Sequence, residues 1–291
     1  MIQPIHYSQL TSEIAHKGCF VLEMPNEDYH RYDGISNSGL SLVARSPAHY
    51  AYRSKFEQTR HMEIGTAFHT ALLEPQRYAS EYVTTHGVND RRKSEYKEAA
   101  KHYGADCTLT DKEGAGIDVM IESVRANQYA TEVLNQDGWA ELSAFIEDPE
   151  TGVLMRCRFD WLTTDGRAVD VKKTQDCRQR PFQRAIHTYR YHCQQAMYSH
   201  IYRLITGEDI GAYHILAIEE QPPCANVLYT LDDLAVSHGH KEYRETLESY
   251  AKAVDSGVWS GYDAQADVIG LPEYVLMDID EGQDNVLGGY E

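Results

Sequence analysis

The sequence lacks long hydrophobic runs and paired cysteines. No apolar stretch approaches the roughly 18 residues that a membrane span needs, which excludes an integral membrane protein. The start, Met1 to Tyr7, has no basic flank followed by an apolar core, so we expect no secretory signal and a cytoplasmic location. The six cysteines form no C-x-x-C pair, which disfavours a zinc ribbon or an iron–sulfur cluster and is typical of a reducing compartment.

Positive charge is also scarce, and it is unevenly placed. The 291 residues carry 45 acidic side chains against 27 Lys plus Arg, a formal net charge of −18. This balance excludes a general DNA-coating protein, because phosphate contacts need Lys and Arg. Residues 156–190, however, hold nine Lys or Arg and four Asp, a local net of +5, whereas 263–291 holds eight acidic residues and no Lys or Arg. We therefore expect an acidic exterior with one basic active face.

Hydrophobic periodicity predicts an α/β protein, with a central mixed sheet flanked by helices. We expect one domain over residues 1–262, largely looped up to about Tyr32. Its expected parts are an N-terminal helical part over 29–135, a catalytic sheet and helix over 139–231, a last helix over 232–256, and then a loosely ordered acidic tail over 263–291.

Local signals predict the individual elements. Ser36 supplies a helix cap, and Pro47 is expected to end or kink that helix. A second helix over 64–73 carries an apolar stripe with His69 beside it. The other expected elements are a basic loop running into a helix over 89–101, a helix over 117–134, strands over 141–146, 153–162, 168–174, 213–219 and 227–231, and one long helix over 181–205.

Two consecutive strands carry the chemically suggestive residues. Alternation along a strand places Asp160 on one face with Arg156 and Arg158, and Asp170 on one face with Lys172. If the strands are neighbours, Asp160, Asp170 and Lys172 converge. Two such carboxylates repel each other unless a cation lies between them, and Mg²⁺ prefers carboxylate oxygens. Lys172 would then hold or deprotonate a water, although on this pattern alone two strand-ending acids with a solvated lysine partner are the more common arrangement, because short motifs recur by accident.

The helix that follows adds a polar stripe. Gln194 and Tyr198 are four residues apart, so they project from one helix face, and Arg190 is expected one turn earlier on the same line. This stripe either contacts a phosphodiester chain or is an ordinary surface stripe beside core positions.

Together these residues resemble a known family. Asp160, then Asp170-Val171-Lys172, then Gln194-x-x-x-Tyr198 resembles the PDDEXK (restriction-endonuclease-like) nuclease superfamily of the RecB and lambda-exonuclease type. Three further segments narrow the resemblance to the nuclease domains of the exodeoxyribonuclease VIII (RecE) family. They are Gly34–Leu40 with Ser46–Tyr50, Gly65–Pro75, and Tyr189-Arg190-Tyr191-His192-x-Gln194. The resemblance covers roughly residues 29–259.

The resemblance implies roles for individual residues. His69, Asp160 and Asp170 would bind a divalent metal with the Val171 carbonyl, and Lys172 would be the catalytic lysine. Gln194 and Tyr198 would complete the catalytic pocket. Glu141, on the preceding strand, is a weaker candidate for a second metal. Asp170 stands where the superfamily usually has Glu, a variant that related exonucleases share, and Phe159 replaces a Pro that makes no metal contact.

The resemblance also implies an activity. Such enzymes use Mg²⁺, with Mn²⁺ as a substitute, to digest linear double-stranded DNA in the 5′-to-3′ direction. They release 5′-phosphate products and leave 3′ overhangs. A ring-shaped homo-oligomer, trimer or tetramer, would thread the DNA end. A single-strand annealing protein would use the product in phage or prophage recombination inside a bacterial host cell, with no membrane involved.

Several residues are candidates for DNA contact. Ser36 and Ser38 lie at a helix start, where backbone N–H groups favour phosphate, although plain N-capping explains them equally well. The remaining candidates are arginines: Arg45, Arg91, Arg92, Arg156, Arg158 and Arg190.

Two alternatives stay open at the level of sequence. One is a related PDDEXK nuclease of different polarity or with an endonucleolytic cut. The other is a non-enzymatic acidic protein that mimics DNA, which the charge of −18 favours and the aligned acids and lysine oppose.

Overall fold

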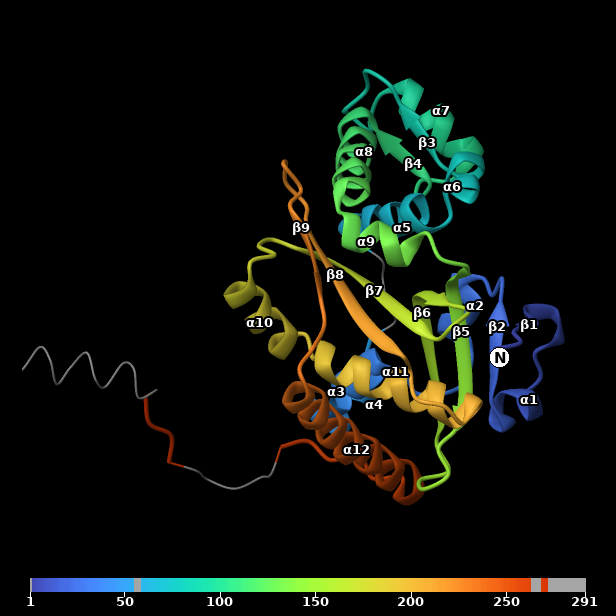
Figure 1. Ribbon diagram of the computed structural model, residues 1–291, viewed down its shortest axis with the longest axis vertical. Helices are drawn as coiled ribbons and strands as arrows, with labels where there is room; N and C mark the ends of the chain where they lie inside the picture. The colour runs from blue at the N-terminus through green and yellow to red at the C-terminus, as the bar shows by residue number, and fades with distance from the viewer. Residues whose placement is uncertain (1, 55–58, 263–267, 272–291) are drawn as a thin grey trace, which may run out of the picture.

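A mixed β-sheet forms the centre of the molecule (Figure 1). The computed structural model describes residues 2–54, 59–262 and 268–271, and in these residues the sheet has the order β1-β2-β5-β6-β7-β8-β9. The strands are β1 (Ile5–His6), β2 (Cys19–Leu22), β5 (Gly138–Glu147), β6 (Leu154–Thr163), β7 (Arg167–Thr174), β8 (Ala212–Glu219) and β9 (Asn226–Tyr229). β1 and β2 pair in parallel, as do β7 and β8, and the other neighbours are antiparallel. The predicted α/β class with a mixed sheet is confirmed.

Helices cover both faces of this sheet. The helical segments are η1 (Tyr7–Gln9), α1 (Ser12–Lys17), α2 (Asn26–Arg31), α3 (Asn37–Arg45), α4 (Pro47–Ala51), α5 (Arg60–Leu73), α6 (Pro75–Glu81), α7 (Ser94–Tyr103), α8 (Asp111–Ala126), α9 (Gln128–Leu134), α10 (Gln179–Thr188), α11 (Tyr191–Thr206) and α12 (Asp233–Ser256). Alternate strand residues enter different cores. Ile215 joins the core under α11 and α12, whereas its neighbour Leu216 joins the core under α5, α8 and α9.

A smaller lobe stands at one end of the sheet (Figure 1). It contains α6, α7, α8 and a parallel pair of short strands, β3 (Val83–Thr85) and β4 (Thr108–Thr110). Helix α5 connects the lobe to the sheet, since Phe68 and Ala71 pack in the same core as Val171 of β7. Glu74, the residue that follows α5, leads directly into α6, which begins at Pro75.

Several sequence expectations hold, and three are wrong. Ser36 caps α3, and Pro47 begins α4. The segment up to Tyr32 is not mostly loop, because β2 pairs with β5 and extends the sheet, a distant pairing that local patterns do not reveal. The helix expected over 117–134 begins at Asp111 and is interrupted at Asn127, whose side chain caps α9. The acidic tail expected over 263–291 lies, apart from residues 268–271, outside the described residues.

The helix expected over 181–205 is also interrupted. α10 ends at Thr188, and Arg190 takes a left-handed conformation with φ of 57° before α11 begins. Such a φ is uncommon for any residue except glycine. The apolar periodicity continues across the interruption, which is why the sequence suggests one helix.

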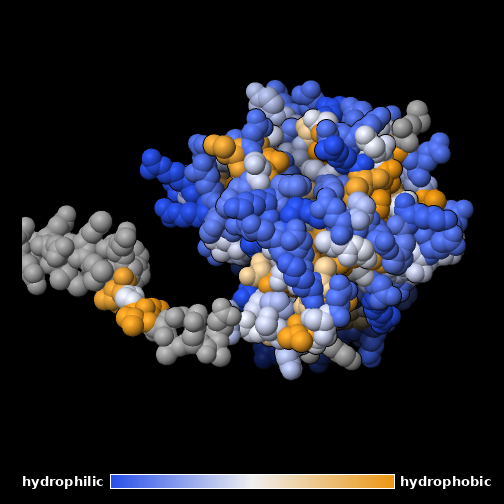
Figure 2. Space-filling model, turned by 90° about the horizontal axis from the view of Figure 1, so that it is seen from below, coloured by the Kyte–Doolittle hydropathy of each residue, from blue (hydrophilic) through white to orange (hydrophobic). Residues whose placement is uncertain are grey.

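The exterior is predominantly hydrophilic. Figure 2 shows one face, on which hydrophobic residues form only small scattered patches. Among the described residues, the helices are all too short or too polar to cross a membrane.

Helices α11 and α12 approach each other closely at Gly239. A Cβ atom added at Gly239 would lie 2.3 Å from the carbonyl oxygen of His192. Backbone atoms cannot turn aside as side chains can, so the contact depends on glycine at this position. Gly116 in α8 provides the opposite case, because an added Cβ there would meet nothing within 4 Å.

We expect the two glycines to respond to substitution with opposite signs. Gly239→Ala should lower the free energy of unfolding by at least ~1–3 kcal/mol, because the added methyl group overpacks a backbone contact. Gly116→Ala should raise it by about 0.5–1 kcal/mol, because alanine is the better helix former. Urea unfolding of the two variants measures both changes. Unchanged stability of Gly239→Ala would contradict the close helix contact.

A charged cluster fastens α5 to the lobe. The Arg60 guanidinium donates to both carboxylate oxygens of Glu113, over 3.1 and 2.6 Å, and Arg91 pairs with the same carboxylate. The Thr110 amide donates to Glu113 as well, over 2.9 Å, which completes the cap of α8. Burial by itself would raise the pKa of Glu113, but the hydrogen bonds from Arg60 and Thr110 lower it to about 2.

Glu113 should therefore make stability depend on pH. Its folded pKa is depressed, so the stabilisation is complete above the unfolded pKa of about 4.5 and is lost as pH falls toward 2. We expect Glu113→Gln to cost about 1–2 kcal/mol at neutral pH, after allowance for solvent screening, and progressively less below pH 4.5. Urea unfolding at several pH values measures this difference. Glu245→Gln, at an exposed pair with Lys241, is the matched control and should change little.

Candidate metal and catalytic site

The site lies where strands β6 and β7 separate. Their ladder consists of the pairs Leu162–Ala168 and Trp161–Val169, and the next position in the same register places Asp160 opposite Asp170. The ladder is not continued there. The Val171 amide instead donates to the Asp160 carboxylate over 2.7 Å. The strands thus separate at the two acidic residues. β6 and β7 are neighbours in the sheet, which is the condition on which Asp160, Asp170 and Lys172 converge.

Two further elements bring potential ligands to Asp160. His69 projects from α5, and its Nδ1 atom lies 3.7 Å from Asp160 Oδ2 and 3.9 Å from Glu141 Oε1. One ligand atom from each of His69, Glu141 and Asp160 lies within 4.8 Å of the others. Glu141, expected only as an auxiliary ligand, therefore belongs to the same cluster as His69 and Asp160.

Glu141 has an unusual backbone. It faces Asp160 across the β5–β6 ladder, between the pairs Ala140–Trp161 and Leu142–Phe159, with φ of 49°. A left-handed residue within a strand is uncommon, and flanking pairs hold it in place here. The conformation interrupts the regular ladder at the point where the carboxylate meets His69.

Asp170 is held by its own partners. Its side chain is buried, with Lys172 Nζ 2.8 Å from Oδ2 and the Gln194 side-chain amide donating to Oδ1 over 2.7 Å. The lysine ammonium also lies 5.1 Å from the centre of the Tyr191 ring. Asp170 thus fixes the position of Lys172 beside the His69–Glu141–Asp160 cluster.

Burial and neighbouring charges act in opposite directions on the pKa values of the cluster. Loss of solvent, reinforced by Asp170 and Glu141, raises the pKa of Asp160 to about 7 although His69 and Lys172 oppose the shift. Burial disfavours the charged form of His69 and of Lys172 as well, yet nearby carboxylates outweigh it and raise the pKa of both. Among the described residues, the three carboxylates of Glu141, Asp160 and Asp170 have only His69 and Lys172 as cationic partners within ion-pair distance. A divalent cation would supply further positive charge, and two carboxylates with one imidazole form a suitable donor set.

A cleft of about 1210 Å³ opens onto these groups. The sequence-predicted residues that line it are Ser38, His69, Glu141, Arg158, Asp160, Val171 and Lys172. Sequence reasoning missed Glu74, Arg77 and Tyr191, which line it too. Glu74 and Tyr191 lie within the segments 65–75 and 189–194 that carry the family resemblance, and those segments were the available signal.

Gln194 and Tyr198 lie behind the cleft and do not line it. Gln194 contacts the site through its hydrogen bond to Asp170. The Tyr198 ring packs edge-on against Phe159, with the ring centres 5.3 Å apart, and burial raises its pKa well above the ordinary value. The expected stripe with Arg190 is wrong, because the interruption before α11 turns Arg190 toward Glu242 of α12, at 2.9 Å.

The proposed DNA-contacting arginines are largely used within the protein. Arg156 donates to the carbonyl of Tyr29, and Arg158 to the carbonyl of Met24 and the hydroxyl of Ser143, so both fasten α2 and the segment before it to β6. Arg158 still borders the cleft.

The other arginines lie elsewhere. Arg45 donates to the Tyr262 hydroxyl, Arg91 pairs with Glu113, and Arg92 pairs with Asp90. None of these three lines the described cleft.

Of the two roles considered for Ser36 and Ser38, the structure shows N-capping, by Ser36. The Ser36 hydroxyl accepts from the Gly39 amide and lies 2.9 Å from the Ser38 hydroxyl. Ser36 is therefore an N-cap, whereas Ser38 borders the cleft.

Comparison with known proteins gives a family and a fold. Residues 36–272 match the family described as a PDDEXK-like domain of unknown function (DUF3799). No curated protein matches the chain at a significant level. The crystal structure of a candidate exonuclease from Eubacterium rectale superposes with a TM-score of 0.57 at 13% identity, covering 90% of this chain and 99% of that one. At this identity the likeness shows the fold alone.

A second solved structure is more distant. The crystal structure of SSO0001 matches with a TM-score of 0.27 and 14% identity over 66% of this chain and 86% of that one, which is too weak to support any argument.

The cluster predicts a stabilising response to divalent cations. Mn²⁺ in hundredfold excess over its Kd should stabilise the folded protein by about 2.7 kcal/mol and raise Tm. Asp160→Asn and His69→Gln should abolish this metal-induced shift, because each removes a ligand atom from the cluster. The shift is the measured quantity, since Asp160→Asn also removes a buried charge and changes the metal-free Tm. Asp209→Asn, at an exposed site, is the control. An equal shift in Asp160→Asn would place the metal elsewhere.

Proposed function

The chain belongs to the family of PDDEXK-like domains described above, and on that basis we propose that it is a metal-dependent deoxyribonuclease. PDDEXK nucleases are generally dependent on divalent metals. The observation that supports the proposal is the meeting of Asp160, Asp170 and Lys172 where β6 and β7 separate, with His69 and Glu141 across the same cleft.

The residues in and behind the cleft would have separate roles in phosphodiester hydrolysis. His69, Glu141 and Asp160 would hold the divalent ion, which when bound supplies Lewis-acid polarisation of a phosphoryl oxygen. Lys172 places its ammonium beside Asp170, where it can orient a water and stabilise negative charge that develops on the phosphate. Gln194 holds the second oxygen of Asp170, so the carboxylate presents Lys172 in one orientation.

We further propose a RecE-type activity with Mg²⁺ as the ion and Mn²⁺ as a substitute. The enzyme would digest linear double-stranded DNA in the 5′-to-3′ direction, release 5′-phosphate products and leave 3′ overhangs. The order along the chain of the motifs that carry the resemblance supports this assignment, and so does the likeness to a protein described as a candidate exonuclease. A ring-shaped homo-oligomer on the DNA end, and an annealing protein that uses the overhang in phage recombination, belong to the same proposal.

Lys172→Ala tests the mechanism. We expect it to reduce digestion of a linear duplex with Mg²⁺ by at least ~10²-fold, since it removes the positive charge beside the phosphate, while duplex binding persists. Rates of release of labelled nucleotide measure the loss. Lys241→Ala, at an exposed position on α12, should leave the rate unchanged. Undiminished digestion by a folded Lys172→Ala protein would refute the proposed mechanism.

Substrate form tests the mode of cutting. A 5′-labelled and a 3′-labelled linear duplex should lose label at different times if digestion has the proposed polarity. Covalently closed circular DNA should stay intact, because an exonuclease needs an end. Cleavage of closed circles would indicate an endonuclease and refute the proposed exonuclease activity. Failure to cut any DNA with Mg²⁺ or Mn²⁺ would refute the proposed nuclease function.

A further inference from the structure

A second group of potential metal ligands lies where helices α11 and α12 meet. His192 and Cys193 are in the first turn of α11, and Glu242 is in α12. One ligand atom from each of the three residues lies within 4.8 Å of the others. None of the three lines the catalytic cleft described above, so this group is separate from the cluster around His69.

The close contact between the two helices brings these side chains together. An added Cβ at Gly239 would lie 2.3 Å from the carbonyl oxygen of His192, so the backbones meet directly beside the group. The Cys193 thiol donates to Glu242 Oε2 over 3.2 Å, and His192 Nε2 lies 3.3 Å from the same oxygen. Ligand atoms around a tetrahedral zinc ion are about 3.3–3.6 Å apart, given bonds of about 2.0–2.3 Å. Both contacts with Glu242 are therefore close to the spacing that zinc ligands need.

His192 contributes a buried nitrogen without a hydrogen-bond partner. Its side chain is 5% exposed, and its Nδ1 atom lies 3.3 Å from the Ile186 carbonyl oxygen. Because a carbonyl oxygen only accepts, this contact places the proton on Nδ1 and leaves a lone pair on Nε2. Among the described residues that Nε2 atom has no hydrogen-bond partner, although the Glu242 carboxylate is near it. Two acceptors thus lie together in a buried place, and a metal-binding histidine is commonly held through its other nitrogen in this way.

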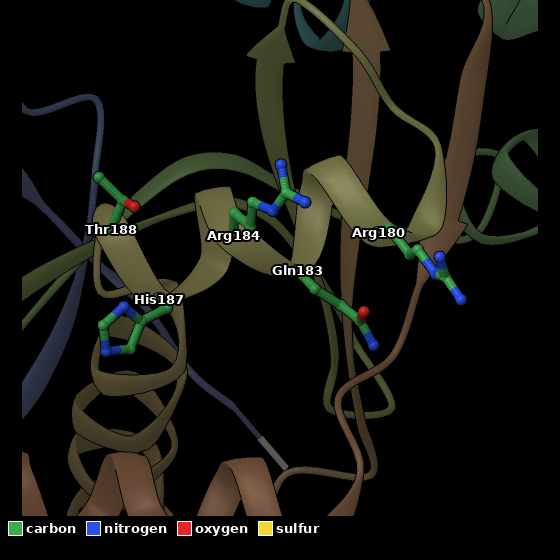
Figure 3. Close-up of a pocket in the computed structure, with 5 residues that line it drawn as sticks. All are labelled: Arg180, Gln183, Arg184, His187 and Thr188. Atoms are coloured by element: carbon green, nitrogen blue, oxygen red, sulfur yellow. The ribbon is translucent and has the colours of Figure 1, made fainter. Parts of the chain in front are cut away.

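Two exposed histidines flank the buried one. The rings of His187 and His238 lie nearly parallel to that of His192, with planes inclined by 13° and 9°. Figure 3 shows His187 projecting from α10, where it lines a shallow hollow. His238 lies one turn before Glu242 on α12, with its Nε2 atom 3.0 Å from Oε1 and its side chain 59% exposed. His238 is thus placed to meet an ion that arrives from solvent.

We propose that His192, Cys193 and Glu242 bind a structural zinc ion. His238 would be the fourth ligand. Thiolate, imidazole and carboxylate together are typical zinc ligands, whereas the hard ion Mg²⁺ prefers oxygen ligands alone. Without an ion, burial, reinforced by the hydrogen bond to Glu242, raises the pKa of Cys193 to about 12. Metal binding would release this thiol proton to solvent, and the ion would replace the Arg190 guanidinium that now lies 2.9 Å from Glu242.

The ion would fasten the helix that supports the catalytic site. Gln194 follows Cys193 directly on α11, and its side-chain amide donates to Asp170 over 2.7 Å. A metal bond between the first turn of α11 and α12 would therefore hold the helix next to this contact. The inference does not depend on the nuclease function, because metal binding is measured without DNA.

Cobalt spectroscopy of the full chain tests the site. A thiolate bound to Co²⁺ gives a charge-transfer band in the near ultraviolet, which the cluster of His69, Glu141 and Asp160 cannot give because it contains no cysteine. Reduced, metal-free protein should develop this band on titration with Co²⁺, and Zn²⁺ should then remove the band by displacing the cobalt. Cys193→Ser should abolish the band. His238→Gln should weaken Co²⁺ binding by at least about tenfold, the smallest effect typical of losing even an outer partner of a metal site.

Matched controls separate the site from general effects. Cys107→Ser removes a cysteine that lies immediately before β4 in the lobe, and His240→Gln removes an exposed histidine two residues from His238. Both variants should show the wild-type band and affinity. Thermal unfolding shows whether each variant is folded.

Four outcomes count against the proposal. Absence of a thiolate-to-cobalt band in the wild type would overturn it. An unchanged band in folded Cys193→Ser, or a lost band in folded Cys107→Ser, would place the metal at another thiol and overturn it as well. Unchanged affinity of His238→Gln would refute the assignment of the fourth ligand. The nuclease proposal is unaffected by all four, since Lys172→Ala tests it separately.

Discussion

The hydrogen bond from the Val171 amide to the Asp160 carboxylate determines the architecture of the site. It occupies the position where a main-chain ladder bond between β6 and β7 would form, so the two strands separate there. β7 continues in parallel with β8, which keeps Asp170 and Lys172 in register while their other side opens to the cleft. The site is therefore a consequence of how the sheet is paired. Without that separation, Asp160 and Asp170 would lie on a closed sheet surface.

The remaining groups are arranged around this opening by rigid elements. Glu141 comes from the next strand, His69 from a helix, and Gln194 from a helix on the opposite face of the sheet. Each approaches from a different direction, and each is fixed by a packed element. This packing holds the carboxylates of Glu141, Asp160 and Asp170 in a defined geometry, although like charges repel each other.

The sequence predicted the groups that lie close together in the chain or follow a simple period. Alternation along the strands placed Asp160, Asp170 and Lys172 correctly, because strand period and pairing leave little freedom. The resemblance, not the periodicity, suggested His69. The interruption at Arg190 could not be predicted, since it depends on Glu242 from a distant helix, and neither could the joining of β2 to β5. Both features depend on contacts between residues that are far apart in the sequence. Such contacts also direct Arg156 and Arg158 to main-chain carbonyls.

Helix α5 belongs to two parts of the molecule at once. Its first residue, Arg60, donates hydrogen bonds to Glu113 of the lobe. His69, about 13 Å further along the same helix, lies beside the Asp160 carboxylate of the sheet. Phe68 and Ala71 of the same helix pack in one core with Val171 of β7, and residues of α8 and α9 belong to that core as well. The position of the His69 imidazole is therefore tied to the packing of the lobe, because one continuous apolar core holds both.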